Sequence, residues 1–179
     1  MTFDHSIVAY LNEMAQAVPL VEGVTVFFAR YVPYLFAALF VVWALLLPRQ
    51  KKEKLILFCE GFGAGLLARF GGVELIRAVS HRPRPFAADP SIIPLISETS
   101  SAFPSGHATF FFALSTIVYL HNRRWGVWCY LASALIGMAR VAAGVHYPLD
   151  IVGGAVLGIL VGWIFYYGIR AVLKKTTSS

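Results

Sequence analysis

Charged residues are scarce in this chain of 179 residues. Asp, Glu, Lys and Arg together make up 13% of the sequence, against about 25% in a typical soluble domain. Hydrophobic residues make up 58%. This balance excludes an ordinary soluble protein and predicts a single membrane-embedded domain over residues 1–179.

Cysteine is almost absent as well. Cys59 and Cys129 both fall inside apolar runs, which excludes a disulfide framework and a cysteine-ligated metal site. The chain has only 9 Asp and Glu residues and no cluster of them that suits magnesium, so we expect no metal and no other cofactor. We expect no cleavable signal peptide either, because residues 1–20 lack a basic start followed by an apolar core.

Long apolar segments, by contrast, are abundant. A helix needs roughly 20 mainly apolar residues to cross a bilayer, and four segments meet that length. A fifth, over residues 105–120, is shorter but is apolar apart from His107 and a few hydroxyls. We therefore predict an all-α, polytopic transmembrane helical bundle of five spans. They cover residues 24–47, 55–79, 105–120, 125–143 and 148–173.

The two ends of the chain differ from these spans. Within residues 1–20, apolar side chains recur at helical spacing beside polar ones, which predicts a helix lying in the membrane interface. A sixth, short span there is the alternative. Residues 176–179 form a polar tail that we expect to be disordered. The apolar positions near the N-terminus are Ile7, Leu11, Met14 and Val18.

Basic residues give the chain a formal net charge of +6, but they cluster at the ends of apolar segments. That pattern predicts contact with a bilayer and no nucleic-acid partner. Nine of the 15 Lys and Arg residues fall on one side of the predicted spans, which should be the cytoplasmic side. The N-terminus and the loops at 80–104 and 144–148 then face outward. The nine are Arg49, Lys51, Lys52, Lys54, Arg123, Arg124, Arg170, Lys174 and Lys175.

Several glycines are spaced by four residues, so that each pair shares a helix face and permits close helix contact. We interpret this spacing as internal packing rather than dimerisation, and the oligomeric state stays open. The pairs are Gly61 with Gly65, Gly154 with Gly158, and Gly158 with Gly162.

Three polar clusters interrupt the apolar pattern, all on the predicted outward side. Charged residues at membrane depth are costly and by default indicate a functional site. The first cluster holds Glu74, Arg77 and the stretch His81-Arg-Pro-Arg-Pro85; the second is Pro104-Ser-Gly-His107; the third holds Arg140, His146 and Asp150.

The arginines of these clusters indicate a phosphate pocket. Arg77, Arg84 and Arg140 would repel one another unless an anion lay between them, and planar guanidinium groups match phosphate oxygens. Ser105 and Gly106 open a helix, where free N–H groups and the helix dipole favour an anion.

The histidines add the means for a reaction. His146 and Asp150 are four residues apart, so the carboxylate can accept a hydrogen bond from one imidazole nitrogen and leave the other free as a nucleophile. His107 follows Gly106 and lies within reach of the same anion. Glu74, three residues before Arg77, either holds that guanidinium or merely reaches the interface.

Each cluster alone has an ordinary explanation: a stiff exit from the membrane, a helix start, or a structural His–Asp pair. Their occurrence together at one membrane face favours a site. A non-hydrolytic lipid-phosphate binder or transporter is one alternative, although such a protein needs donors and no nucleophile. A structural or assembly protein is another, for which the polar clusters would be an unexplained cost.

These motifs resemble the type 2 phosphatidic acid phosphatase family, PAP2. Its signature is Lys, six residues, Arg-Pro; then Pro-Ser-Gly-His; then Ser-Arg, five residues, His, three residues, Asp. The chain matches it from Arg77 to Asp150 with two departures. Arg77 replaces the usual Lys, and Ala139 replaces the usual Ser, which removes one polar contact near the phosphate.

The resemblance implies a metal-independent phosphatase acting on a lipid phosphate or diphosphate. It assigns His146 as nucleophile, Asp150 as its support and His107 as the acid and base. The arginines, Ser105 and Gly106 would hold the phosphoryl group. Within the family the chain resembles bacterial undecaprenyl diphosphate phosphatases, which implies a bacterial inner or plasma membrane and an extracytoplasmic site. Phosphatidylglycerophosphate, phosphatidic acid and lipid A phosphates are the alternative substrates.

Overall fold

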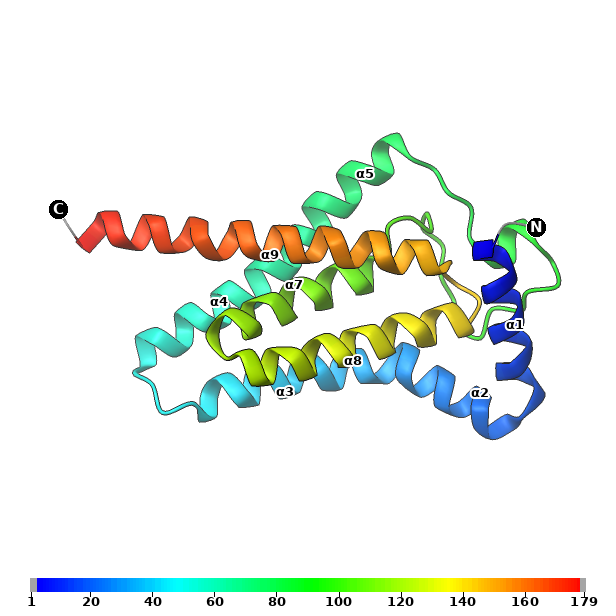
Figure 1. The fold of residues 1–179 in the computed structure, drawn as a ribbon, viewed down its shortest axis with the longest axis horizontal. Coiled ribbons are helices and arrows are strands. Elements are labelled where there is room, and N and C mark those ends of the chain that lie inside the picture. Colours follow the sequence, from blue (N-terminus) through cyan, green and yellow to red (C-terminus); the bar gives the residue numbers. More distant parts are fainter. Residues whose placement is uncertain (1–2, 178–179) are drawn as a thin grey trace.

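The computed structural model describes residues 3–177, which form helices and connecting loops without any β-strand (Figure 1). This confirms the predicted all-α fold class. Two long rods each contain a π-helical segment, and three further long helices run beside them. The first rod comprises α2 (Pro19–Val26), η1 (Phe27–Tyr31) and α3 (Val32–Leu46); the second comprises α4 (Lys51–Leu66), η2 (Leu67–Val73) and α5 (Glu74–Val79). The others are α1 (Phe3–Ala17), α6 (Pro85–Ala88), α7 (Gly106–His121), α8 (Arg123–Ala142) and α9 (Pro148–Thr177).

Four helices among the described residues are long and apolar enough to cross a membrane. Helix α7 has 16 residues and is about 24 Å long, shorter than the roughly 30 Å hydrocarbon core. The fifth predicted span therefore stays a prediction. The four are Pro19–Leu46, Lys51–Val79, Arg123–Ala142 and Pro148–Lys175.

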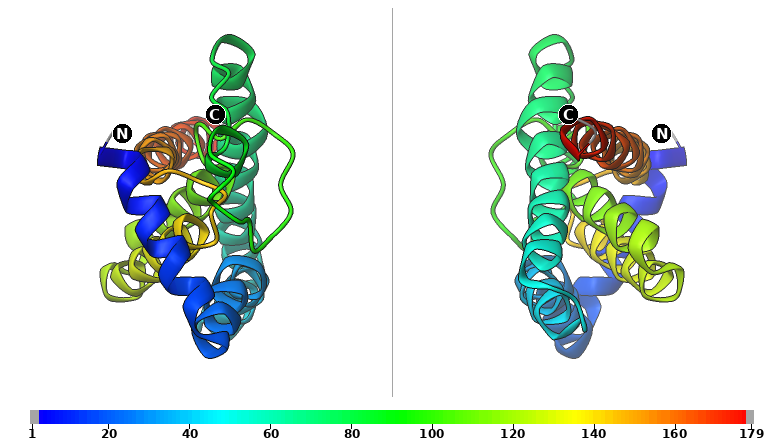
Figure 2. Two further views of the ribbon diagram at one scale, coloured as in Figure 1. Left: turned by 90° about the vertical axis from the view of Figure 1, so that its right-hand side faces the viewer. Right: turned by 90° about the vertical axis from the view of Figure 1, so that its left-hand side faces the viewer.

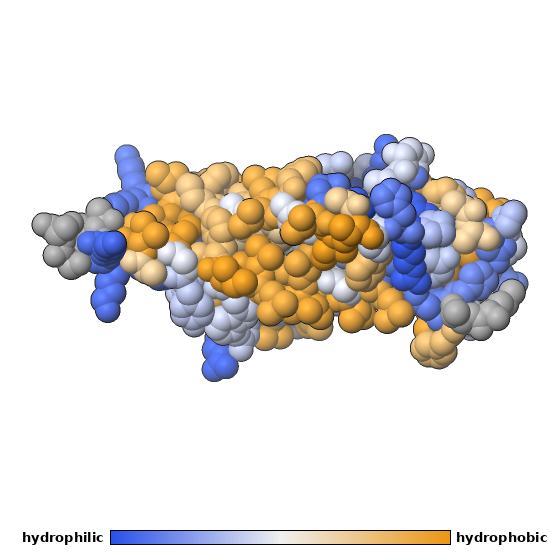
Figure 3. Space-filling view, turned by 90° about the horizontal axis from the view of Figure 1, so that it is seen from above, coloured by the Kyte–Doolittle hydropathy of each residue, from blue (hydrophilic) through white to orange (hydrophobic). Residues whose placement is uncertain are grey.

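Helix α7 forms the centre of the bundle, with α4, α8 and α9 packed around it (Figure 2). Phe111 and Leu114 on α7 lie in one apolar cluster with Phe36 and Phe40 of α3 and Ile136 of α8. The surrounding helices turn many large apolar side chains outward, and on the face seen in Figure 3 these form a broad apolar band across the middle of the molecule. That band is the surface expected to face lipid.

Glycines on α9 let it approach α7 closely. A Cβ atom at Gly154 would lie 2.7 Å from the backbone oxygen of Ser105, and one at Gly158 would collide with the backbone oxygen of Thr109. The glycine spacing therefore serves internal packing, as predicted. The start of α7, with Ser105, Gly106 and His107, and the first turn of α9, with Asp150, are held side by side as a result.

Helix α1 lies across one end of the bundle, which we call the α1 end (Figures 1 and 2). Its protein-facing side carries two buried polar residues, Asp4 and Asn12, whereas Met14 and Val18 are exposed. Asn12 Nδ2 donates to the carbonyls of Ile93 and Ala142, both at 3.0 Å, so this polar side chain satisfies backbone groups inside the protein. The placement of α1 in a membrane interface stays a prediction.

The opposite end of the bundle carries the loop between α3 and α4 and the end of α9. Helix α9 continues as helix to Thr177, two residues into the tail predicted to be disordered, and residues 178–179 lie outside the described residues. Glu60 is fully buried at this end. Its Oε2 accepts a hydrogen bond from His121 Nε2 at 2.6 Å, which connects α4 to α7.

The close contact of α7 and α9 gives a first test. Gly158→Ala should lower the free energy of unfolding by about 1–3 kcal/mol, because the added methyl group meets the α7 backbone, which cannot turn aside as a side chain can. Gly168→Ala is the matched control, since nothing lies within 4 Å of its Cβ position, and helix propensity should make it neutral or stabilising by up to about 1 kcal/mol. Denaturant unfolding in detergent measures both, and equal effects would contradict this packing.

Candidate active site

The three polar clusters come together at the α1 end of the bundle, where residues of α5, α7, α8 and α9 are linked by hydrogen bonds through the connection between α5 and α7. His107 is half-buried, and the other residues predicted for the site are all buried. These are Arg77, Arg84, Ser105, Gly106, Arg140, His146 and Asp150.

Arg77 and Arg84 are held by the same serine. Arg77 Nη1 and Arg84 Nη2 each donate to the Ser100 hydroxyl at 3.2 Å, and Arg84 Nε donates to the Ser100 carbonyl at 2.7 Å. Arg77 also reaches the Pro104 carbonyl at 3.0 Å, which connects it to the start of α7. Burial lowers the pKa of Arg84 to about 10, so this group still carries its positive charge at neutral pH.

Glu98 lies between two of the arginines and was not predicted as a site residue. Its carboxylate accepts from Arg84 Nη2 at 3.4 Å and from Arg140 Nη2. Burial alone would raise the pKa of Glu98, but the guanidinium groups of Arg140 and Arg84 outweigh it and hold that pKa below its usual range. The carboxylate is therefore an anion in contact with the donors that were predicted to bind phosphate.

The second hydrogen-bond partner of Arg140 is a backbone carbonyl that stands four residues before a proline. Arg140 Nη1 donates to the Ala29 carbonyl at 3.3 Å, in the π-helical segment η1. Pro33 stands four residues after Ala29 and has no N–H group, so it cannot make the usual helical hydrogen bond to that carbonyl. The Ala29 carbonyl thus helps to hold a charged group that is almost fully buried.

The start of α7 faces the same group of side chains. Ser105 is the N-cap residue, and its own N–H donates to the Asp150 carbonyl at 3.0 Å. Gly106 and His107 follow as the first helical residues, whose N–H groups have no intrahelical acceptor. A Cβ atom at Gly106 would lie 2.6 Å from the side-chain Cδ of Arg69, so the absence of a side chain here leaves room for Arg69 beside the helix start.

Arg69 is the second residue near the site, after Glu98, that the sequence analysis did not predict. Its Nη1 lies 2.5 Å from Glu74 Oε1, whereas Arg77 Nη1 lies 3.5 Å from the same oxygen. Glu74 therefore contacts Arg77 as proposed, but its tighter partner is Arg69. No motif singles out Arg69, which reaches the site from η2 because α4, η2 and α5 form one continuous rod.

His146 lies between Asp150 and Arg84. Its Nδ1 is 3.4 Å from Asp150 Oδ2, and its Nε2 is 3.5 Å from Arg84 Nη1. A guanidinium can only donate, so the Nε2 atom that faces it carries the lone pair. Burial lowers the pKa of His146 well below its usual range, and the charges of Arg140 and Arg84 act in the same direction. The imidazole is therefore neutral at pH 7.

Taken together, three buried guanidinium groups, a helix start and a neutral imidazole can bind a phosphoryl group and attack it. His107 lies within electrostatic range of Glu98, Arg140 and His146, so it belongs to the same group of side chains. Among the described residues, no three His, Cys, Asp or Glu side chains are placed to hold a metal ion.

Known proteins match this chain over most of its length. Bacitracin transport permease protein BcrC of Bacillus licheniformis is 32% identical over 154 residues, covering 84% of this chain and 73% of that protein. Undecaprenyl-diphosphatase BcrC of Bacillus subtilis is 31% identical over 150 residues, covering 82% and 74%. The crystal structure of Aquifex aeolicus LpxE superposes with a TM-score of 0.73 at 25% identity, covering 93% of this chain and 96% of that one.

The PAP2 superfamily itself matches residues 56–174, a segment that contains all three polar clusters. The family match confirms the predicted resemblance, and together with the undecaprenyl-diphosphatase of Bacillus subtilis it confirms the prediction of a phosphatase. The chain belongs to the PAP2 superfamily.

Proposed function

We propose that this membrane phosphatase hydrolyses a lipid phosphate or diphosphate through a phosphohistidine on His146, with undecaprenyl diphosphate as its preferred substrate. The observation that carries the proposal is the fully buried, neutral His146 beside Arg84, at one end of an apolar bundle. A lipid can keep its chain beside the apolar band while its phosphate enters this end of the protein.

The first chemical step transfers the phosphoryl group to the enzyme. The lone pair of His146 Nε2 attacks phosphorus, and the bond from phosphorus to the leaving oxygen breaks. His107, which takes up a proton when the anionic phosphate binds beside it, gives that proton to the leaving oxygen, while Asp150 supports the imidazole of His146 that becomes positively charged. The phosphoryl oxygens are held by Arg77, Arg84 and Arg140, with the Ser105 hydroxyl and the Gly106 N–H as further donors.

The second step returns the enzyme to its starting state. His107, now neutral, takes a proton from water, and the resulting hydroxide attacks the phosphohistidine. The bond from phosphorus to His146 Nε2 breaks, which releases inorganic phosphate and restores the neutral imidazole. The arginines supply the charge stabilisation that a metal would supply in other phosphatases, so we propose that no metal is required.

The substrate assignment follows from the relative of Bacillus subtilis whose name is undecaprenyl-diphosphatase. Phosphatidylglycerophosphate, phosphatidic acid and lipid A phosphates remain the alternatives. A purified preparation in detergent containing EDTA should release phosphate fastest from undecaprenyl diphosphate. Faster release from another lipid would reassign the substrate, and loss of release with EDTA would overturn metal independence.

A non-hydrolytic transporter is the alternative from another class, and the relative of Bacillus licheniformis is named a transport permease. Binding and release of a lipid phosphate require the arginines. Binding and release do not require a buried imidazole whose lone pair faces Arg84 and whose other nitrogen faces the Asp150 carboxylate. His146 and Asp150 therefore favour hydrolysis.

The nucleophile assignment predicts a specific loss. His146→Ala should reduce turnover by more than about 10⁴-fold, because no other group near the arginines replaces the attacking nitrogen. His81→Ala is the matched control, since His81 is exposed in the connection after α5 and should leave turnover unchanged. Steady-state phosphate release measures both, and retained turnover in the His146 variant would disprove the assignment.

Replacing Glu98 should strengthen phosphate binding, whereas replacing His146 should abolish turnover. The Glu98 carboxylate contacts Arg84 and Arg140, so an incoming phosphate must compete with it for these donors. Glu98→Gln should therefore tighten product inhibition by inorganic phosphate by roughly tenfold, equivalent to about 1.4 kcal/mol. Glu13→Gln removes the same charge from an exposed position and should have no effect. Weaker inhibition in the Glu98 variant would mean that the carboxylate is needed to hold the arginines for phosphate.

Sidedness determines which lipid pool the enzyme reaches. Nine basic residues flank the spans at the end opposite the site, so we propose that the site opens to the extracytoplasmic face. Single cysteines at Ser91 and Lys52, in a background without Cys59 and Cys129, can be treated with a membrane-impermeant thiol reagent on intact cells. Labelling should occur at position 91 and not at position 52, and the reverse result would place the site on the cytoplasmic face.

A further inference from the structure

Arg82 joins two carboxylates that are far apart in the sequence. Its Nη1 lies 2.7 Å from Asp150 Oδ1, and its Nη2 lies 2.5 Å from Asp4 Oδ2 on helix α1. A planar guanidinium that binds two carboxylates through separate nitrogens fixes the position of each relative to the other. The N-terminal helix is thereby connected to the aspartate that supports His146.

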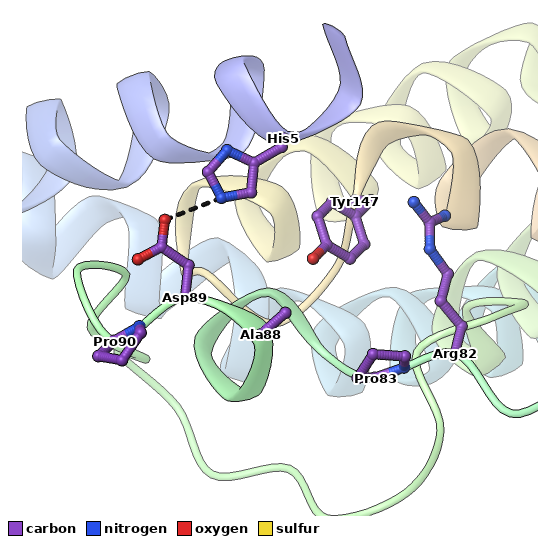
Figure 4. Close-up of a pocket in the computed structure, with 7 residues that line it drawn as sticks. All are labelled: His5, Arg82, Pro83, Ala88, Asp89, Pro90 and Tyr147. Carbon is purple, nitrogen blue, oxygen red and sulfur yellow. Dashed lines mark ion pairs between the residues drawn. The ribbon is translucent and has the colours of Figure 1, made fainter. Parts of the chain in front are cut away.

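Asp4 also contacts the helix that carries Asp150. Its Oδ1 accepts from the N–H group of Leu149 at 3.1 Å, in the first turn of α9. The guanidinium of Arg82 in turn lies over the ring of Tyr147, 4.1 Å from its centroid. Figure 4 shows Arg82 and Tyr147 side by side beneath α1, in a pocket of about 380 Å³. The contacts with Asp4, Asp150 and Tyr147 together hold Arg82 in a single orientation.

Asp150 divides its two oxygens between this arrangement and the histidine. Oδ1 receives Arg82, whereas Oδ2 receives the Tyr147 N–H at 2.8 Å and faces His146 Nδ1 at 3.4 Å. Rotation of the carboxylate would alter its contact with the imidazole, and the bond from Arg82 opposes that rotation. No hydrogen bond or ion pair joins Arg82 to Arg77, Arg84 or Arg140, so its influence on the site passes through Asp150.

We propose that Asp4 and Arg82 are positioning residues for the reaction: helix α1 orients Asp150 through Arg82, and Asp150 in turn orients His146. The proposal rests on the proposed function for its effect on turnover. It also makes α1 a part of the catalytic arrangement, although the helix contributes no group that touches phosphate.

The chain offers a matched control for this proposal. His5 Nε2 lies 2.9 Å from Asp89 Oδ2, an ion pair that also ties α1 to the connection between α5 and α7. It lies across the same pocket from Arg82 (Figure 4). No hydrogen bond or ion pair joins His5 or Asp89 to Asp150. Asp4→Asn and Asp89→Asn therefore make the same chemical change in the attachment of α1, but only the first removes the partner of Arg82.

Kinetics of the purified full chain on a lipid diphosphate provide the first readout. Asp4→Asn should lower kcat by about 10–100-fold and leave KM within roughly threefold, the size of effect typical of groups that orient a functional side chain. Asp89→Asn should leave both unchanged, and Asp4→Glu should restore part of the lost kcat. Equal losses in the Asp4 and Asp89 variants, together with equally lowered melting temperatures, would show that α1 acts only on folding and overturn the proposal.

A second readout needs no turnover, so it separates this proposal from the proposed function. In ¹⁵N-histidine-labelled protein, the His146 signals can be assigned by their loss in His146→Ala. Asp4→Asn should shift the His146 Nδ1 and Nε2 resonances, and Asp89→Asn should leave them in place. Unshifted resonances in the Asp4 variant would refute the coupling, whereas shifted resonances in a protein that releases no lipid phosphate would refute the hydrolase alone.

Discussion

The burial of three guanidinium charges at one end of an apolar helix bundle is the constraint on which the rest of the structure depends. Removing such charges from water costs several kcal/mol each unless acceptors surround them. Glu98, Ser100 and the Val145 carbonyl supply acceptors for Arg84, and Glu98 serves Arg140 as well. The loop between α6 and α7 folds back over the bundle and brings Glu98 and Ser100 to the arginines, and the Ala29 carbonyl in η1 accepts a hydrogen bond from Arg140.

Close packing of α7 against α9 fixes the position of Asp150 relative to the start of α7. Glycines on α9 bring its first turn to the start of α7, where the Ser105 N–H binds the Asp150 carbonyl. The cap of one helix and the carboxylate of the other are consequently parts of one rigid unit, and the positive ends of both helix dipoles face the same group of side chains. We infer that mutations along the glycine stripe affect the chemistry as well as stability, because a change of helix separation moves His146 relative to the phosphate donors.

Much of this arrangement could be predicted from the sequence because it depends on local patterns. Apolar segments of sufficient length predicted the long helices, and the arginine and histidine spacings predicted which residues gather at one end. Glu98 and Arg69 could not be found in this way, since their partners are set by the path of a loop and by a continuous rod. Arg82 stood in a predicted cluster, but its role was hidden because its partner Asp4 lies on α1. The faces of α1 were also hidden: Asp4 and Asn12 point into the protein because they satisfy groups on distant segments, which no helical period reveals.

The central claim is that His146 carries the phosphoryl group, and trapping the intermediate tests it most directly. The protein can be mixed with lipid diphosphate labelled with ³²P at the terminal phosphate and quenched in alkali within milliseconds. A phosphohistidine survives alkali and is lost in acid, so the labelled peptide can be isolated and sequenced. We expect the label on the peptide containing His146, with none in the His146→Ala protein. Label on His107, or turnover without a labelled protein, would contradict the mechanism.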